Sequence, residues 1–182
     1  MARFGSLLLV ALPSIVYAEP AFRVVGLHLD MGFKAAVAAA EKLGGSCEVG
    51  THRRGEVTFA RCEYSACTED EAACPQGGTS VPTLGMAPVP VVRIGLEARD
   101  DSALLSRVAI VFDGDFDRVA QGLEQVYGAP ADDTAVSSPD SWSNSRRLFW
   151  REGEFSMALL KRRQTIMLTT TRPEGPGENE KP

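Results

Sequence analysis

The sequence has little of what the commonest active sites require. Only two histidines, His28 and His52, occur among its 182 residues, and no Gly-x-Ser-x-Gly, Ser-x-x-Lys or His-Glu-x-x-His motif is found. A serine or cysteine nucleophile needs a base beside it. These motifs usually indicate such a nucleophile–base pair or the metal site of a zinc protease. Gly77-Gly78 is followed by neither Lys-Thr/Ser nor a helix pattern, so a phosphate-binding loop is also missing. We therefore predict no catalytic residue, no metal and no cofactor.

An excess of positive charge and a long hydrophobic run are absent as well. The chain carries 19 Lys and Arg residues against 24 Asp and Glu, a net charge of −5, which argues against a general nucleic-acid binder. Beyond the N-terminal region nothing approaches the roughly 18–20 consecutive apolar residues of a membrane-spanning helix. The hydrophobic share of 44% excludes disorder of the whole chain and is enough for one ordinary core.

The N-terminal region has the pattern of a secretory signal peptide. Arg3 precedes the apolar run Leu7–Val16, and Ala18 ends a Val-Tyr-Ala sequence that suits signal peptidase. The run is about half as long as a spanning helix needs, and Pro13 interrupts it. No cysteine stands where a lipoprotein would carry its anchor. We predict that residues 1–18 are removed and that the mature protein is soluble, without a membrane span, and periplasmic or secreted.

Four cysteines in an exported chain favour disulfides over free thiols. They are Cys47, Cys62, Cys67 and Cys74, and they allow three connectivities. Residues 46–64 are typical of a hairpin that turns at Arg54-Gly55, which places Cys47 directly opposite Cys62, within disulfide reach. Cys67 and Cys74 would then close an acidic loop. A zinc site is the alternative, but the close C-x2-C spacing that it favours is missing.

Periodicity predicts two helices among short strands. Apolar residues at helical spacing indicate helices at 33–43 and 116–127, the second with Asp115 as N-cap and Gly128 as its stop. Residues 75–90 contain too much proline and glycine for a helix or a central strand, and residues 132–145 read as a polar loop. The expected strands are 22–29, the two arms of the 46–64 hairpin, 91–98, 104–112, 146–151, 154–161 and 164–171.

This order predicts an α+β fold. We expect a single domain over residues 19–172, made of two tandem helix-plus-antiparallel-strand repeats with the helices packed on one face of the sheet. The first repeat would span about 22–112 and the second about 113–171. Residues 173–182 contain no apolar side chain and are expected to form a disordered tail.

Two segments, GLHLDMGFKAAVAAAEKLGG and FDRVAQGLEQVYGAP, resemble the recurring motif of small bacterial envelope proteins. These are the outer-membrane-assembly lipoproteins of the SmpA/OmlA type and the related β-lactamase inhibitory proteins. Asp30-Met31-Gly32 stands where Gly-Met-Ser is usual in that family, whereas Tyr127-Gly128-Ala129-Pro130 and the later Trp150 match it better. The resemblance covers about residues 24–171 and implies recognition of another protein by a sheet face. The chain departs from the family in its missing lipid-anchoring cysteine and in its acidic and proline-rich loops.

Charge segregation marks a candidate binding surface. Residues 146–172 carry seven cations against two acids, whereas residues 63–71 carry four acids and no cation. Cations with nearby aromatic side chains can attract an acidic partner and anchor it. The alternative is that these cations protect exposed strand edges from pairing with other chains. Trp150 is expected in the core. The candidate partner-binding residues are Arg146, Arg147, Trp142, Phe149, Arg151, Arg162 and Arg163.

These features together predict a non-enzymatic binding protein. Its partner would be another envelope protein, and its role that of an enzyme inhibitor or an assembly accessory. Two alternatives stay open. One is a small-ligand or metal-ion binder that uses the 75–90 loop as a lid, and the other is a hydrolase with an unrecognised carboxylate site.

Overall fold

The computed structural model describes residues 22–52, 57–64, 89–136, 145–162 and 165–172. The signal peptide expected at 1–18, the pair Cys67 and Cys74, the tail at 173–182 and most of the 75–90 loop lie outside the described residues. The elements, in chain order, are α1 (Phe33–Lys42), β1 (Ser46–Thr51), β2 (Thr58–Glu63), β3 (Val91–Ala98), β4 (Leu105–Phe112), α2 (Phe116–Tyr127), β5 (Asp132–Val136), β6 (Ser145–Glu152), β7 (Phe155–Arg162) and β8 (Thr165–Thr171).

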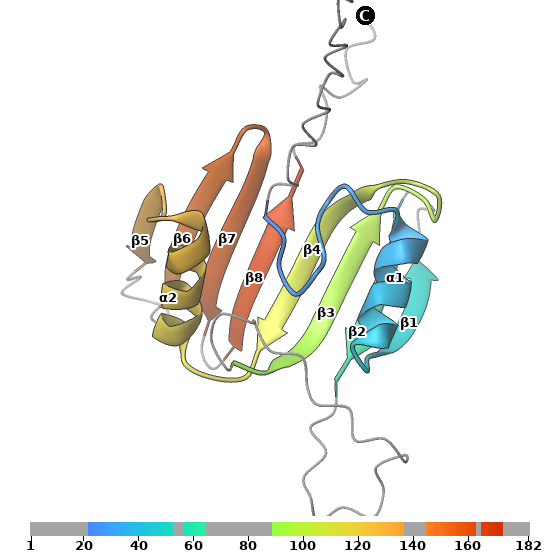
Figure 1. The fold of residues 1–182 in the computed structure, drawn as a ribbon, viewed down its shortest axis with the longest axis horizontal. Coiled ribbons are helices and arrows are strands. Elements are labelled where there is room, and N and C mark those ends of the chain that lie inside the picture. The colour runs from blue at the N-terminus through green and yellow to red at the C-terminus, as the bar shows by residue number, and fades with distance from the viewer. Residues whose placement is uncertain (1–21, 53–56, 65–88, 137–144, 163–164, 173–182) are drawn as a thin grey trace, which may run out of the picture.

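All eight strands belong to one antiparallel sheet, in the order β1-β2-β3-β4-β8-β7-β6-β5 (Figure 1). The prediction of two tandem helix-plus-strand repeats is therefore wrong. Strand β4 pairs with β8 from Arg107↔Thr171 to Phe112↔Ile166, and this pairing continues the sheet across the expected boundary. The two halves join because β4 would otherwise present a row of unpaired N–H and C=O groups in the middle of the molecule.

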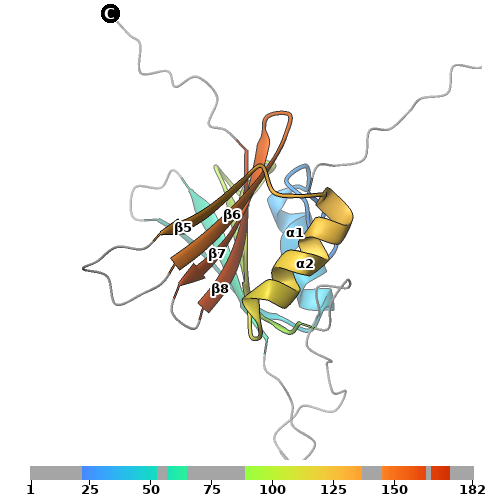
Figure 2. The same cartoon turned by 90° about the vertical axis from the view of Figure 1, so that its left-hand side faces the viewer.

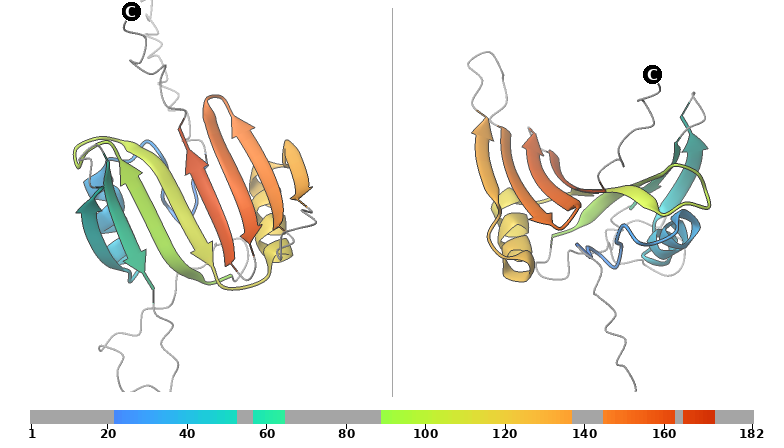
Figure 3. Two further views of the ribbon diagram at one scale, coloured as in Figure 1. Left: turned by 180° about the vertical axis from the view of Figure 1, so that it is seen from behind. Right: turned by 90° about the horizontal axis from the view of Figure 1, so that it is seen from above.

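Both helices lie on the same side of this sheet (Figure 2). Alternate strand residues point toward them and are buried, as Ile94, Leu96 and Ala98 of β3 show. Helix α1 contributes Phe33 to the same core, together with Ala36 and Ala40, and α2 contributes Phe116, Val119 and Leu123. The sheet is curved, and the face without helices lies on the inner side of the curve (Figure 3).

Helix α2 begins and ends where its sequence predicts. The carboxylate of Asp115 accepts hydrogen bonds from the N–H groups of Asp117 and Arg118, at 2.9 and 3.1 Å. Gly128 follows the last helical residue with a φ of 76°, a conformation that glycine adopts without steric cost. These two residues position α2 over the second half of the sheet.

The strand expected at 22–29 is absent, and this prediction is wrong. Val24 and Leu27 instead close a tight turn, in which each N–H donates to the other residue's C=O at 2.9 Å. Phe22 and Val25 adopt positive φ angles of 50° and 53°, which a strand does not contain. The apolar pattern of this segment reflects burial of its side chains, since Leu29 and three others are at most 3% exposed.

The loop expected at 132–145 is also partly wrong, because residues 132–136 form β5 and pair with β6. Polar residues suit this strand because it lies at the sheet edge. The strand ends expected at 151 and 154, and at 161 and 164, imply two-residue turns that pair Arg151 with Glu154 and Lys161 with Gln164. In the structure Arg151 pairs with Ser156 and Lys161 with Ile166. The register moves by two residues, so every side chain keeps its predicted alternation between the faces.

Candidate functional site

The face of the sheet without helices is the candidate site, and we call it the open face. Side chains that alternate with the buried ones point toward it. The register aligns Gly95, Ala109, Thr169 and Ala158 in one row across β3, β4, β8 and β7. These small side chains protrude little, so the middle of the open face offers room for a partner.

Arg147, Phe149 and Arg151 lie side by side on the open face of β6, and we call them the β6 strip. Their orientation follows from Leu148 and Trp150 between them, which are 1% and 3% exposed on the helix side. The guanidinium groups of Arg147 and Arg151 lie 5.4 and 5.6 Å from the centre of the Phe149 ring. Both arginines are exposed, and neither forms an ion pair with any residue that the structure describes.

The arginines on the other half of the open face form ion pairs within the molecule. Arg61 and Arg93 both contact the carboxylate of Glu63, and Arg107 approaches Glu97 at 3.4 Å. Burial opposes ionisation of Glu63, but hydrogen bonds and charge from its two arginines hold its pKa below the usual value. Among the side chains that the structure describes, the β6 strip is therefore the part of the open face that offers cations without an ion-pair partner.

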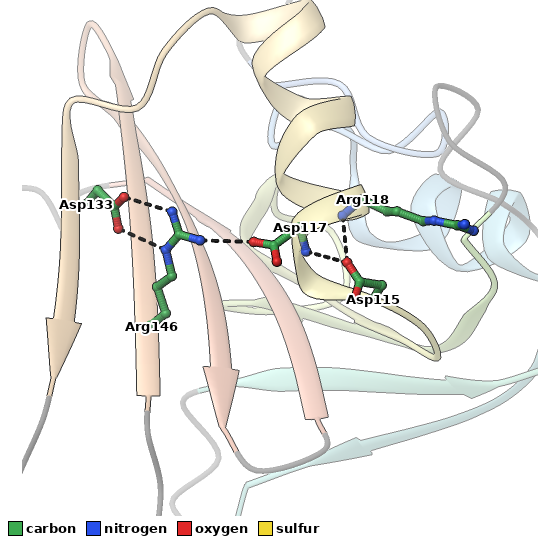
Figure 4. Close-up of polar contacts among 5 residues, drawn as sticks. All are labelled: Asp115, Asp117, Arg118, Asp133 and Arg146. Atoms are coloured by element: carbon green, nitrogen blue, oxygen red, sulfur yellow. Dashed lines mark hydrogen bonds and ion pairs between the residues drawn. The ribbon is translucent and has the colours of Figure 1, made fainter.

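Arg146 points to the opposite side of the sheet from the β6 strip. Its Nε and Nη2 atoms donate to the two carboxylate oxygens of Asp133 at 3.1 and 2.9 Å, and its Nη1 atom donates to Asp117 at 3.0 Å (Figure 4). Its guanidinium group also lies 5.5 Å from the centre of the Phe116 ring. Arg146 thus links β5 and β6 to the start of α2, and its donors are used within the molecule.

The structure does not bring the other predicted site residues together with the β6 strip. Lys161, which was not among them, joins Arg146 on the helix side, with its ammonium 5.9 Å from the centre of the Phe116 ring. Arg162 ends β7 and pairs with Thr165. Trp142 and Arg163 lie outside the described residues. Sequence reasoning missed Arg61, Arg93 and Arg107, which the alternation of buried residues in β2, β3 and β4 would have placed on one face.

Cys47 and Cys62 form a disulfide with an S–S distance of 2.01 Å, as the hairpin register predicts. Cys62 is fully buried and Cys47 packs against the same core. Within the described ranges no three His, Cys, Asp or Glu side chains are close enough to hold a metal ion. Across the same ranges no helix has the length and apolar character to span a membrane.

A hollow of about 320 Å³ lies beside the β6 strip, between the end of α2 and the end of β6. Its lining includes Tyr127, Trp150, Arg151 and Glu152. The Tyr127 hydroxyl donates to the Arg23 carbonyl at 2.7 Å, and the Trp150 indole donates to Gly128 at 2.9 Å, so two of its polar groups already have partners. Glu152 is the one carboxylate among the described lining residues, whereas paired-carboxylate hydrolysis needs two.

Comparison of the chain with protein-family models, with curated proteins and with solved structures finds no match in any of the three. The resemblance to envelope-assembly lipoproteins and β-lactamase inhibitory proteins therefore stays a prediction from short motifs.

Proposed function

We propose that this protein is an exported, non-enzymatic binding protein whose open face recognises another protein. The observation that supports this proposal is the β6 strip, in which two exposed arginines without ion-pair partners among the described residues flank Phe149. Arginine and aromatic side chains are enriched among the residues that contribute most to binding energy at protein interfaces. A curved sheet surface on which neither helix lies provides the area that such an interface requires.

Protection of an exposed strand edge explains the arginines of the β6 strip less well than recognition does. Lysine and arginine residues protect a strand when its backbone groups are unpaired. Strand β6 pairs with β7 along its length, and with β5 from Ser145 to Phe149. Arg147 therefore has no edge to protect, whereas Arg151 lies beyond the end of the β5 pairing. A role in recognition accounts for the exposure of Arg147 on a strand that is paired on both sides.

Export is the second part of the proposal. The N-terminal region resembles a cleavable signal peptide, and a disulfide persists best in an oxidising compartment. The partner would then be another protein of the cell envelope or of the surrounding medium. Its contact surface would be acidic, because the β6 strip is cationic.

A capture experiment tests the proposal. The mature chain is immobilised and exposed to periplasmic extract of the source organism at several salt concentrations, beside the charge-reversed variant Arg147→Glu/Arg151→Glu. We expect the parent chain to retain a partner at low salt that the variant does not retain, because surface charge attraction is screened by salt. The matched control is Arg99→Glu/Arg118→Glu, which reverses two exposed arginines outside the strands, one in the turn after β3 and one on α2.

The circular dichroism spectrum and thermal midpoint of each variant show whether it remains folded. A folded Arg147→Glu/Arg151→Glu variant that retains the same partner as the parent would refute the role of the β6 strip. Failure of the parent chain to retain any protein at every salt concentration would count against a protein-binding function altogether.

A further inference from the structure

The outer edge of β1, at the opposite end of the sheet from β5, has no strand partner among the residues that the structure describes. Within the part of the chain that the structure describes, β1 pairs with β2 alone. The N–H of His52 donates to Val57 at 3.0 Å in the same register, so even-numbered residues of β1 form the hydrogen-bonded pairs with β2. The N–H and C=O groups of Cys47, Val49 and Thr51 therefore point away from β2, toward the open edge.

The residues of β1 itself carry none of the side chains that usually prevent strand pairing. Natural edge strands carry lysine, proline or inward-pointing charges, or are very short. Strand β5, at the other edge, has five residues, begins with Asp132 and Asp133, and follows Pro130 closely. Strand β1 contains neither lysine, arginine nor proline, and its one charged side chain, Glu48, lies on the open face. Val49 points to the helix side and is 53% exposed.

An apolar groove lies between this edge and α1. Phe33, Val37 and Ala38 of α1 line it together with Val49, and its volume is about 260 Å³. Lys34 and Asp101 at its rim are paired with each other at 2.8 Å. A strand added beside β1 would place every second side chain next to Val49, over this groove.

We propose that β1 accepts an extended segment of a partner protein as a ninth strand of the sheet. The segment alternates basic and apolar residues: apolar side chains enter the groove, and lysine or arginine side chains lie on the open face beside Glu48. Charge complementarity supports this choice, since Glu48 lies on the open face and forms no ion pair with a described residue. Backbone hydrogen bonds supply affinity in this mode of recognition, and the alternate side chains supply specificity.

A second copy of this chain fits the edge less well. Two β1 strands paired about Glu48 or Val49 place the two Glu48 side chains directly opposite each other or diagonally across the pair, and like charges in these positions are unfavourable. The proposal does not depend on the β6 strip, which lies near the other edge of the sheet.

The probe is the labelled peptide acetyl-Gly-Lys-Ile-Lys-Ile-Lys-Gly-amide, and fluorescence anisotropy measures its binding to the mature, oxidised chain. We expect Val49→Lys to weaken binding by at least about tenfold, because it places a charge in the groove and at the edge. The matched control is Val126→Lys, since Val126 is 54% exposed but lies on α2. Glu48→Gln is expected to weaken binding about two- to fivefold and to reduce its salt dependence.

Methylation of the peptide nitrogens tests the backbone pairing. Methylation of the peptide nitrogens that face β1 is expected to abolish binding. Methylation of the nitrogens on the other edge of the peptide is expected to leave binding unchanged. No binding of the unmodified peptide, equal binding to the Val49→Lys variant, or equal effects of the two methylation patterns would each overturn the proposal. A dimer in analytical ultracentrifugation that Val49→Lys dissociates would also overturn it, by showing that a second copy occupies the edge.

Discussion

Removal of the Cys47–Cys62 disulfide should destabilise the protein by about 3 kcal/mol. The bridge joins residues 15 positions apart, and closing a loop of about 15 residues lowers the entropy of the unfolded chain by an amount worth about 3 kcal/mol at 25 °C. The variant Cys47→Ala/Cys62→Ala removes the bridge without adding a polar group to the core, where Cys62 is fully buried. For a chain of this size the loss corresponds to a fall of about 6–12 °C in the thermal midpoint.

Urea unfolding of the oxidised parent and of the variant measures this difference directly. The control is Cys67→Ala/Cys74→Ala, which keeps the Cys47–Cys62 bridge. If Cys67 and Cys74 form the second predicted bridge, closure of their shorter loop raises the free energy of unfolding by about 2–2.5 kcal/mol. Reductant should then still lower the stability of the Cys47→Ala/Cys62→Ala variant. A Cys47→Ala/Cys62→Ala variant within about 0.5 kcal/mol of the parent would refute the chain-entropy argument for this hairpin.

Three further predictions concern individual side chains. Asp115→Ala should lower the free energy of unfolding in urea by about 1 kcal/mol, whereas Asp115→Asn retains most of the N-cap. Burial raises the pKa of Tyr64 to about 12, and its hydroxyl donates to Ala40. Stability should therefore be complete below pH 10 and fall as the pH rises toward 12, because the unfolded tyrosine ionises first, and Tyr64→Phe should remove this part of the pH dependence. A hydrogen bond from Arg146 lowers the pKa of Asp133 despite some burial, so Arg146→Gln should raise that pKa toward its ordinary value in an NMR titration; an unchanged titration would contradict the pairing.

Local features were predictable from the sequence because they depend on nearby residues. The N-cap at Asp115 and the helix that follows it are determined by capping and periodicity within about 16 residues. The register that brings Cys47 to Cys62 follows from one short hairpin. Trp150 was expected in the core from its alternation with arginines, and its 3% exposure confirms this.

Long-range features were not predictable in this way. The pairing of β4 with β8 joins residues about 60 positions apart, and periodicity within each strand contains no information about it. The same limit applies to the candidate site. Arg146 and Arg147 were predicted for one binding surface, although neighbouring residues of a strand point to opposite faces. Which of the two faces is covered depends on the position of α2, which the strand pattern does not contain. The polar residues of β5 indicated a loop in the sequence, because an edge strand needs few apolar side chains.

The central position of β8 has a consequence for protein synthesis. This strand is the last of the eight to leave the ribosome, yet it lies between β4 and β7 in the finished sheet. A nascent or prematurely terminated chain without residues 165–171 therefore exposes two bare inner strand edges, each ready to pair with a neighbouring polypeptide. A nonsense codon just before residue 165 would therefore be expected to yield an aggregating product instead of a functional one.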